Sequence, residues 1–119
     1  MTSWPEISES ELRRLIHTEH TELPVKLAVY FYTPMCGTCA VGSRMLDVIY
    51  AMEPRYPIVK ANLNAMPALA QDWQIESVPC LILWNQGTMI AKEYAMRSVE
   101  HLLAVLLPFR PPAKNGRGS

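Results

Sequence analysis

An excess charge of either sign, long hydrophobic runs and abundant cysteine are all missing from this chain of 119 residues. Lysine plus arginine equals aspartate plus glutamate at 11 each, so no basic field is available to attract nucleic acid. No apolar run approaches the roughly 20 residues that a membrane helix requires. The first residues also lack a positive stretch followed by an apolar one, which is the pattern of a secretory signal. These absences predict a cytosolic protein with no nucleic-acid or membrane partner, and we expect it to be a monomer.

Cysteine occurs at three positions, Cys36, Cys39 and Cys80. An odd count that includes a pair two residues apart is unlike a secreted disulfide framework and is typical of a reducing compartment. The pair follows the most strand-like stretch of the chain, residues 25–32, and precedes a segment with helical periodicity. A strand that delivers two thiols to the first turn of a helix favours the thiolate, which is the reactive species in disulfide exchange. The surroundings of the pair therefore predict redox chemistry.

The remaining pattern predicts one α/β domain, because a chain of this length buries a single core. The expected helices are 8–21, 39–53, 67–73 and 98–107, and the expected strands are 26–32, 58–63, 80–84 and 88–94. The first two strands flank a helical crossover and should be parallel, whereas the last two should form an antiparallel hairpin. The result is a mixed sheet of four to five strands with helices on both faces.

The pattern also predicts where the domain ends and which residues are buried. We expect the domain to span residues 1–107, and residues 108–119, rich in proline, glycine and charge, to form a disordered tail. The indole of Trp4 is expected at an edge of the fold. The apolar face of the second helix is expected to comprise Val41, Met45, Val48, Ile49 and Met52.

Three motifs together carry a resemblance to a known family. They are the apolar strand that leads into Cys36-Gly37-Thr38-Cys39, Lys60 in the second strand, and Val78-Pro79 before the third. On these residues nearly the whole predicted domain resembles the thioredoxin family, and most closely small bacterial thioredoxin-like proteins of the YtpP type. The resemblance implies a thioredoxin-like fold, thiol–disulfide oxidoreductase activity, and no cofactor beyond a redox-active Cys36–Cys39 disulfide.

The resemblance also implies roles for single residues. Cys36 would be the nucleophile and Cys39 the cysteine that resolves the mixed disulfide. Pro79 would follow a cis peptide bond that presents the backbone of Val78 to an extended substrate, and Gly37 and Thr38 would complete the substrate-binding surface. Substrates would be protein disulfides or mixed disulfides with small thiols. Electrons would come from a thioredoxin-reductase-like donor or a low-molecular-weight thiol.

Several positions depart from the family pattern. Tyr30 stands where thioredoxins usually place a buried aspartate, and a tyrosine cannot act as a base near neutral pH because its reference pKa is about 10. We therefore expect slower resolution or a different proton acceptor. Lys60 matches a family lysine and should favour thiolates electrostatically. Thr38 replaces the usual proline and offers a hydroxyl donor, while Met35 and Ala95 replace a tryptophan and a glycine.

Other interpretations of the same residues stay open at this stage. Cys80 follows Pro79 and is expected near the pair, either as a third redox thiol or as a small buried residue. His17 and His20 could complete a zinc site with the pair, although two surface histidines are the simpler interpretation. The chain could instead be a non-catalytic adaptor that keeps the fold, or a metal or iron–sulfur module using the three cysteines. We expect no metal in the site.

Overall fold

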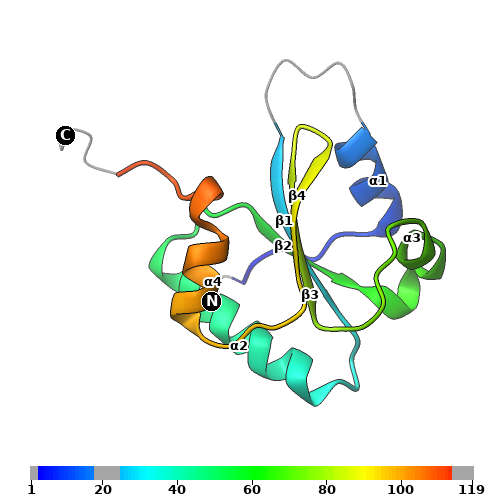
Figure 1. The fold of residues 1–119 in the computed structure, drawn as a ribbon, viewed down its shortest axis with the longest axis horizontal. Helices are drawn as coiled ribbons and strands as arrows, with labels where there is room; N and C mark the ends of the chain where they lie inside the picture. The colour runs from blue at the N-terminus through cyan, green and yellow to red at the C-terminus, as the bar shows by residue number, and fades with distance from the viewer. Residues whose placement is uncertain (1–2, 18–24, 114–119) are drawn as a thin grey trace.

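The computed structural model describes residues 3–17 and 25–113, which form a four-stranded sheet with helices on both faces (Figure 1). The strands are β1 (Lys26–Tyr32), β2 (Ile58–Asn62), β3 (Cys80–Asn85) and β4 (Thr88–Glu93). The helices are α1 (Glu9–His17), α2 (Gly37–Met52), α3 (Pro67–Asp72) and α4 (Val99–Val105), with 3-10 turns η1 (Leu63–Ala65) and η2 (Leu107–Phe109). The predicted α/β fold class is confirmed.

The sheet has the order β2-β1-β3-β4. β1 pairs with β2 in parallel and with β3 antiparallel, and β3 pairs antiparallel with β4, so the predicted mixed sheet is confirmed. The segment before α1 extends the sheet at the β2 edge, because Glu6 forms a parallel bridge with Lys60 and the Ile7 N–H donates to the Lys60 carbonyl at 2.9 Å. This contact brings a residue from the start of the chain beside the second strand.

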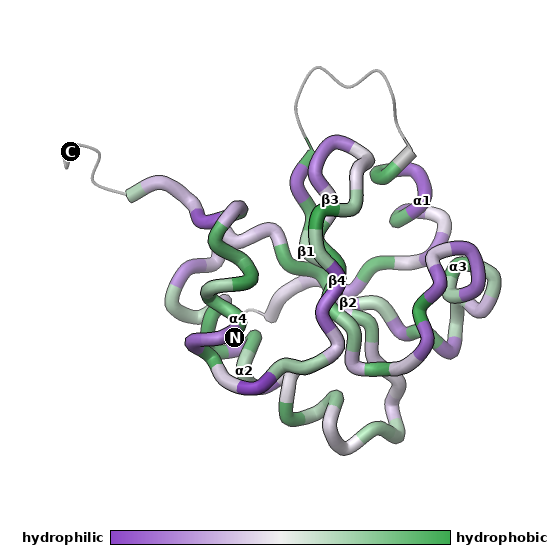
Figure 2. The backbone as a smooth tube through the Cα atoms, viewed as in Figure 1, coloured by the Kyte–Doolittle hydropathy of each residue, from purple (hydrophilic) through white to green (hydrophobic). Residues whose placement is uncertain are grey.

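The sheet separates two hydrophobic cores. Successive side chains of a strand point to opposite faces, so Val29 and Phe31 enter the core under α1 and α3, while Ala28 and Tyr30 enter the core under α2 and α4. Figure 1 shows these two helix pairs on opposite sides of the sheet, and Figure 2 shows the apolar character of the central strands. β1 is buried on both faces, which explains its nearly continuous apolar sequence.

Two of the predicted helix starts are confirmed in detail. The Ser8 hydroxyl accepts from the Glu11 N–H at 3.3 Å, and the Ser98 hydroxyl accepts from the His101 N–H at 3.0 Å. Each such cap typically contributes about 1 kcal/mol. The predicted end of the first helix near residue 20 lies outside the described residues.

The predicted apolar face of α2 is right for Ile49, which is buried, and for Met45, which packs partly buried against the same core, but wrong for its other three residues. The residues buried on α2 are Cys39, Gly42, Leu46 and Ile49. Val41, Val48 and Met52 are exposed instead. The helix carries two neighbouring rows of residues at helical spacing, an exposed outer row and a buried inner stripe. The large apolar side chains of the outer row give the stronger sequence signal, so the inner stripe was not recognised. The inner stripe includes a glycine, which an apolar periodicity does not count.

Two further expectations need correction. Trp4 is buried rather than at an edge: it is 2% exposed, and its indole N–H donates to Asp47 Oδ1 at 2.6 Å. The ordered chain also continues past the boundary predicted at residue 107. Phe109 is buried in the core under α2 and α4, and the Arg55 guanidinium donates to the Pro112 carbonyl at 2.6 Å. Pro108 is the second residue of the η2 turn, where the N–H that proline lacks would have no partner within the turn.

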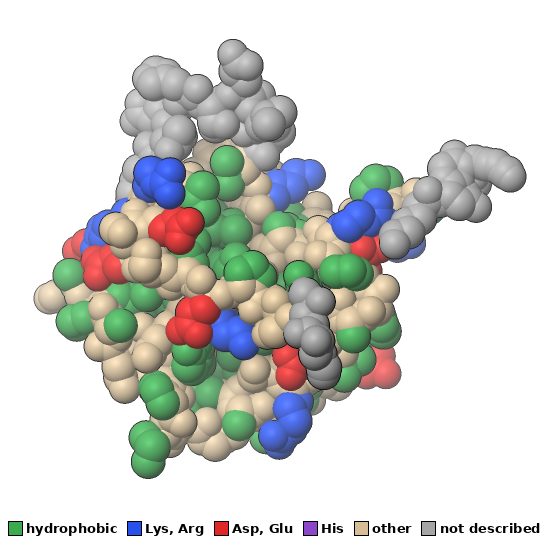
Figure 3. Space-filling view, turned by 180° about the vertical axis from the view of Figure 1, so that it is seen from behind, with side chains coloured by type: hydrophobic (Ala, Val, Ile, Leu, Met, Phe, Trp, Pro, Cys, Tyr) green, Lys and Arg blue, Asp and Glu red, His purple; other side chains and the backbone are tan. Residues whose placement is uncertain are grey.

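The surface shows no large field of one charge on the face drawn in Figure 3, where acidic and basic side chains are interspersed among apolar and neutral ones. This distribution agrees with the formal net charge of zero. Within residues 3–17 and 25–113, no helix combines the length and apolarity needed to cross a membrane.

Candidate active site

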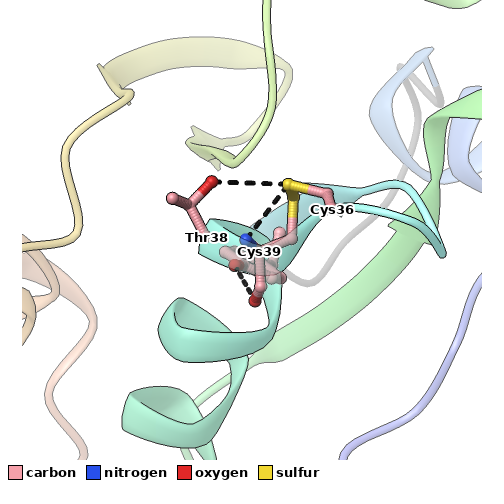
Figure 4. The surroundings of a disulfide bond; sticks show 4 residues. Cys36, Thr38 and Cys39 are labelled. Atoms are coloured by element: carbon pink, nitrogen blue, oxygen red, sulfur yellow. Dashed lines mark hydrogen bonds between the residues drawn. A yellow bond between two sulfur atoms is a disulfide. The ribbon is translucent and has the colours of Figure 1, made fainter.

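Cys36 and Cys39 form a disulfide at the start of α2, with their Cα atoms 5.2 Å apart (Figure 4). Cys36 is the N-cap residue with extended backbone, and its sulfur accepts from the Cys39 N–H at 3.1 Å. The Thr38 hydroxyl lies 3.4 Å from the same sulfur. Two donors and the positive end of the helix dipole therefore surround Cys36 Sγ, which is an arrangement that stabilises a thiolate once the disulfide is reduced.

The two sulfurs differ in exposure. Cys36 is half-buried, whereas Cys39 is only 3% exposed. An incoming sulfur can therefore reach Cys36 and is kept away from Cys39. Spacing of one helical turn still lets Cys39 reach Cys36, as the disulfide itself demonstrates. The order of events suggested by the sequence, with Cys36 first and Cys39 second, is compatible with this geometry.

A shallow groove of about 400 Å³ lies beside the pair. It is lined by Thr38, Val41, Gly42, Met45, Pro79, Tyr94, Ala95, Met96 and Arg97. The Val78–Pro79 bond is cis, as the family resemblance implied. The groove thus joins two predicted substrate-binding residues, Thr38 and Pro79, while Val78 is half-buried, Gly37 is exposed and Met35 is 94% exposed. Tyr94, Met96 and Arg97 also line the groove but were not predicted to do so, because the sequence pointed only to the neighbouring Ala95.

Tyr30 lies against the first turns of α2 and contacts the backbone of Cys39. Its side chain is 1% exposed, and its hydroxyl donates to the Cys39 carbonyl at 2.7 Å. Burial raises the pKa of Tyr30 to about 12, so it stays protonated at neutral pH and cannot accept a proton there. A Cβ atom on Gly42 would lie 2.5 Å from the Tyr30 oxygen and 2.8 Å from Met96 Cγ. Gly42 is therefore the residue that allows the tyrosine ring under the first turns of α2.

A second hollow of about 250 Å³ opens on the β2 side of the pair. It is lined by Glu6, Tyr30, Tyr32, Thr33, Pro34, Cys36, Cys39, Ala40, Ser43 and Lys60. Lys60, predicted to act on the thiolates, lines this hollow together with both cysteines, and its ammonium lies 4.4 Å from the centre of the Trp4 ring. Glu6 and Tyr32 were not singled out from the sequence. No local motif marks them: Tyr32 is the last residue of β1, and Glu6 comes here only because the first segment pairs with β2.

Cys80 is separated from the pair by the sheet. It is fully buried, and its side chain belongs to the core under α1 and α3, whereas Cys36 and Cys39 belong to α2 on the opposite face. Burial raises the pKa of the Cys80 thiol to about 11, which keeps it protonated at neutral pH. The expected third redox thiol is not supported, and the alternative of a small buried residue describes Cys80 best.

The same separation weakens the metal-site alternatives. Three cysteines cannot surround one iron–sulfur cluster or metal when one of them faces another core. Among the described residues, no group of three or more His, Cys, Asp or Glu side chains is placed to hold a metal ion. The combination of His17 and His20 with the pair falls partly outside the described residues, since they exclude His20.

Stability at alkaline pH provides a test of these buried groups. Because the pKa of Cys80 is raised from 9.0 to about 11 and that of Tyr30 from 10.0 to about 12, folding favours both protonated forms. The free energy of unfolding should be flat below pH 9 and fall as the pH rises from 9 to 12. For Cys80 the loss should be on the order of 1–2 kcal/mol, allowing for partial screening.

The measurement is urea unfolding at a series of pH values for the wild type and Cys80→Ala. The variant should lose the part of the decline that begins near pH 9, and it should retain disulfide reduction within about twofold. Equal declines for both proteins between pH 9 and 11 would contradict the assignment.

Comparisons with known proteins agree with this geometry. The thioredoxin family model matches residues 7–107. Thioredoxin-like protein YusE of Bacillus subtilis is 41% identical over 101 residues, which cover 85% of this chain and 89% of that protein. Thioredoxin f2 of Chlamydomonas reinhardtii shares the fold with a TM-score of 0.78 at 20% identity, over 93% of this chain and 100% of that one. Oxidized mitochondrial thioredoxin 3 of Saccharomyces cerevisiae gives a TM-score of 0.71 at 22% identity, over 88% and 94%.

The fold, the cysteine pair at the start of α2 and the cis proline beside it are thus found together with a family match over most of the chain. The chain belongs to the thioredoxin family of thiol–disulfide oxidoreductases.

Proposed function

We propose that the protein reduces disulfides in substrate proteins, or mixed disulfides with small thiols, with Cys36 attacking first and Cys39 resolving. The observation that carries this proposal is the difference between the two sulfurs. Cys36 is reachable and surrounded by donors, while Cys39 is 3% exposed and bonded to it. An adaptor that had lost redox chemistry would have no need for this arrangement.

The reaction has two exchanges. In the first, the Cys36 thiolate attacks one sulfur of the substrate disulfide, and the other substrate sulfur leaves as a thiolate with the electron pair of the broken bond. In the second, Cys39 loses its proton and attacks Cys36, which releases the remaining substrate sulfur and leaves the Cys36–Cys39 disulfide. The substrate gains two electrons and the protein dithiol loses them, so no further cofactor is needed.

The groove beside the pair is the proposed docking surface. An extended segment can pair with the backbone of Val78, the residue before the cis-bonded Pro79 that lines the groove. The exposed side chain of Met35 gives an adaptable apolar contact next to Cys36. Contacts of this kind recognise an extended backbone more than a particular sequence.

The electron donor and location belong to the same proposal. A thioredoxin-reductase-like protein or a low-molecular-weight thiol would return the oxidised pair to the dithiol. A single pair of partnered cysteines with a buried unpaired third is the usage found in reducing compartments, which supports a cytosolic role, and there the protein would act as a monomer.

Reduction of insulin in the presence of dithiothreitol tests the function. We expect precipitation of insulin to accelerate well above the rate with dithiothreitol alone, and the reduction potential of the pair to lie closer to about −270 mV than to about −120 mV. No acceleration, together with slow alkylation of reduced Cys36, would favour the non-catalytic adaptor. A potential near the upper value would indicate an oxidant instead.

A further inference from the structure

The resolving step poses a problem of proton transfer. Cys39 must lose its proton before it can attack, and it is 3% exposed. Its neighbour Tyr30 donates its hydroxyl to the Cys39 carbonyl and stays protonated at neutral pH. The acceptor therefore has to be another group that reaches the same side of α2.

The hollow on the β2 side of the pair supplies that group. Both cysteines line it, and Glu6 provides the one carboxylate among the described residues that do so. The volume of about 250 Å³ has room for several water molecules, since each takes about 30 Å³ in the liquid. The hydroxyl of Ser43 and the ammonium of Lys60 line it as well, so water inside would find polar partners.

Glu6 is held in place from two directions. Its backbone is bridged to Lys60, because the Lys60 N–H donates to the Pro5 carbonyl at 2.9 Å and the Ile7 N–H donates to the Lys60 carbonyl at 2.9 Å. Its carboxylate accepts the hydroxyl of Tyr32 at 2.5 Å. A charge-assisted bond of this length orients the carboxylate, while the exposed position of Glu6 lets a captured proton pass on to solvent.

We propose that Glu6 accepts the proton of Cys39, through water in this hollow, during resolution of the mixed disulfide. This inference rests on the proposed function. The Cys39 S–H proton passes to water and from water to the Glu6 carboxylate. The freed electron pair on Cys39 forms the bond to Cys36, and the substrate sulfur leaves with the electron pair of the bond it loses and takes a proton from solvent.

The surrounding charges are consistent with this role. The groups that face the hollow are Tyr30 and Tyr32 from β1, Lys60 from β2, and the two cysteines from α2. Lys60 favours an ionised neighbour, whether that is the carboxylate or the newly formed thiolate. The nearby carboxylate of Asp47 on α2 accepts the Trp4 indole N–H and does not line the hollow.

The test compares Glu6→Gln with Asp47→Asn, which removes the same charge from a neighbouring carboxylate. Reduced protein is mixed with an excess of an aromatic disulfide that releases thionitrobenzoate. The fast phase of release reports attack by Cys36, and the slower phase reports resolution by Cys39. Glu6→Gln should slow the second phase by roughly 10- to 100-fold at pH 7 and leave the first within about twofold, while Asp47→Asn should leave both phases unchanged.

The pH profile separates a proton acceptor from a structural role. The second phase of the wild type should change little with pH through the neutral range, because the Glu6 carboxylate takes the proton of Cys39. In Glu6→Gln it should keep rising by about tenfold per pH unit through the neutral range, because only direct ionisation of the thiol remains. In Tyr32→Phe the carboxylate persists but loses the hydroxyl that orients it, so the second phase should slow by a smaller factor than in Glu6→Gln.

Each outcome of these measurements either supports or contradicts the role of Glu6 as proton acceptor. A second phase in Glu6→Gln within twofold of the wild type, or a slower one that keeps the wild-type profile, overturns the role of Glu6. If that variant does not fold, an unchanged rate of the second phase in Tyr32→Phe overturns it as well. Failure of the proposed function is distinct, because the wild type itself would then show no fast phase.

Discussion

Replacing Cys36 by serine should abolish disulfide reduction, with the rate in the insulin assay falling by at least about 1,000-fold to the background of dithiothreitol. A serine hydroxyl stays protonated at neutral pH and forms no bond to sulfur under these conditions. The donors that surround Cys36, the Cys39 N–H at 3.1 Å and the Thr38 hydroxyl at 3.4 Å, would then face a neutral oxygen.

Cys39→Ser is the matched variant. It keeps the attacking sulfur and removes the resolving one, so the first exchange should proceed and the mixed disulfide should accumulate. Mass spectrometry of the protein after mixing with a disulfide-containing peptide would show the adduct on Cys36. Accumulation of an adduct in Cys36→Ser, through Cys39, would reverse the proposed order, although the 3% exposure of Cys39 argues against it.

Gly42→Val should destabilise the protein by about 3 kcal/mol, which corresponds to a fall in Tm of roughly 10–20 °C for a domain of this size. In an ordinary helix, replacing glycine gains stability, so the sign of this effect is informative. Here the first added carbon would lie 2.5 Å from the Tyr30 oxygen and 2.8 Å from Met96 Cγ. The tyrosine ring cannot retreat, because it is buried and its hydroxyl is bonded to the Cys39 carbonyl.

A double-variant cycle with Tyr30→Phe isolates the contact. Tyr30→Phe alone should cost about 1 kcal/mol through the lost hydrogen bond. The double variant should be more stable than the sum of the two effects by about 1–2 kcal/mol, since the nearest clashing atom is gone. Thermal unfolding of the four proteins gives the coupling, and strict additivity would mean that the clash with Met96 dominates.

The fold could be predicted from the sequence because residues within or next to each element indicate that element independently. The apolar run of β1, the turn before β4 and the serine caps of α1 and α4 each predict one element by themselves. The cysteine pair gains its meaning from the strand before it and the helix after it. The cis proline came from the family resemblance, since the residues around it do not specify the isomer.

The parts that escaped prediction depend on contacts between distant segments. Glu6 and Trp4 acquire their surroundings only when the first segment pairs with β2. No sequence pattern around either residue predicts that pairing. The orientation of α2 escaped for another reason: Gly42 adds no apolar signal, yet it faces the core because Tyr30 fills the space beside it. The burial of Phe109 depends likewise on the position of α4.

The contact between Tyr30 and Gly42 also bears on how relatives diverge. A side chain at position 42 and a large one at position 30 compete for the same volume, so neither site is free to drift alone. Among homologous chains the two positions should covary, with a bulkier residue at one accompanied by a smaller one at the other. A chain that changed only one of these two residues would be less stable than either matched pair. The combination found at positions 30 and 42 should therefore distinguish lineages within the family.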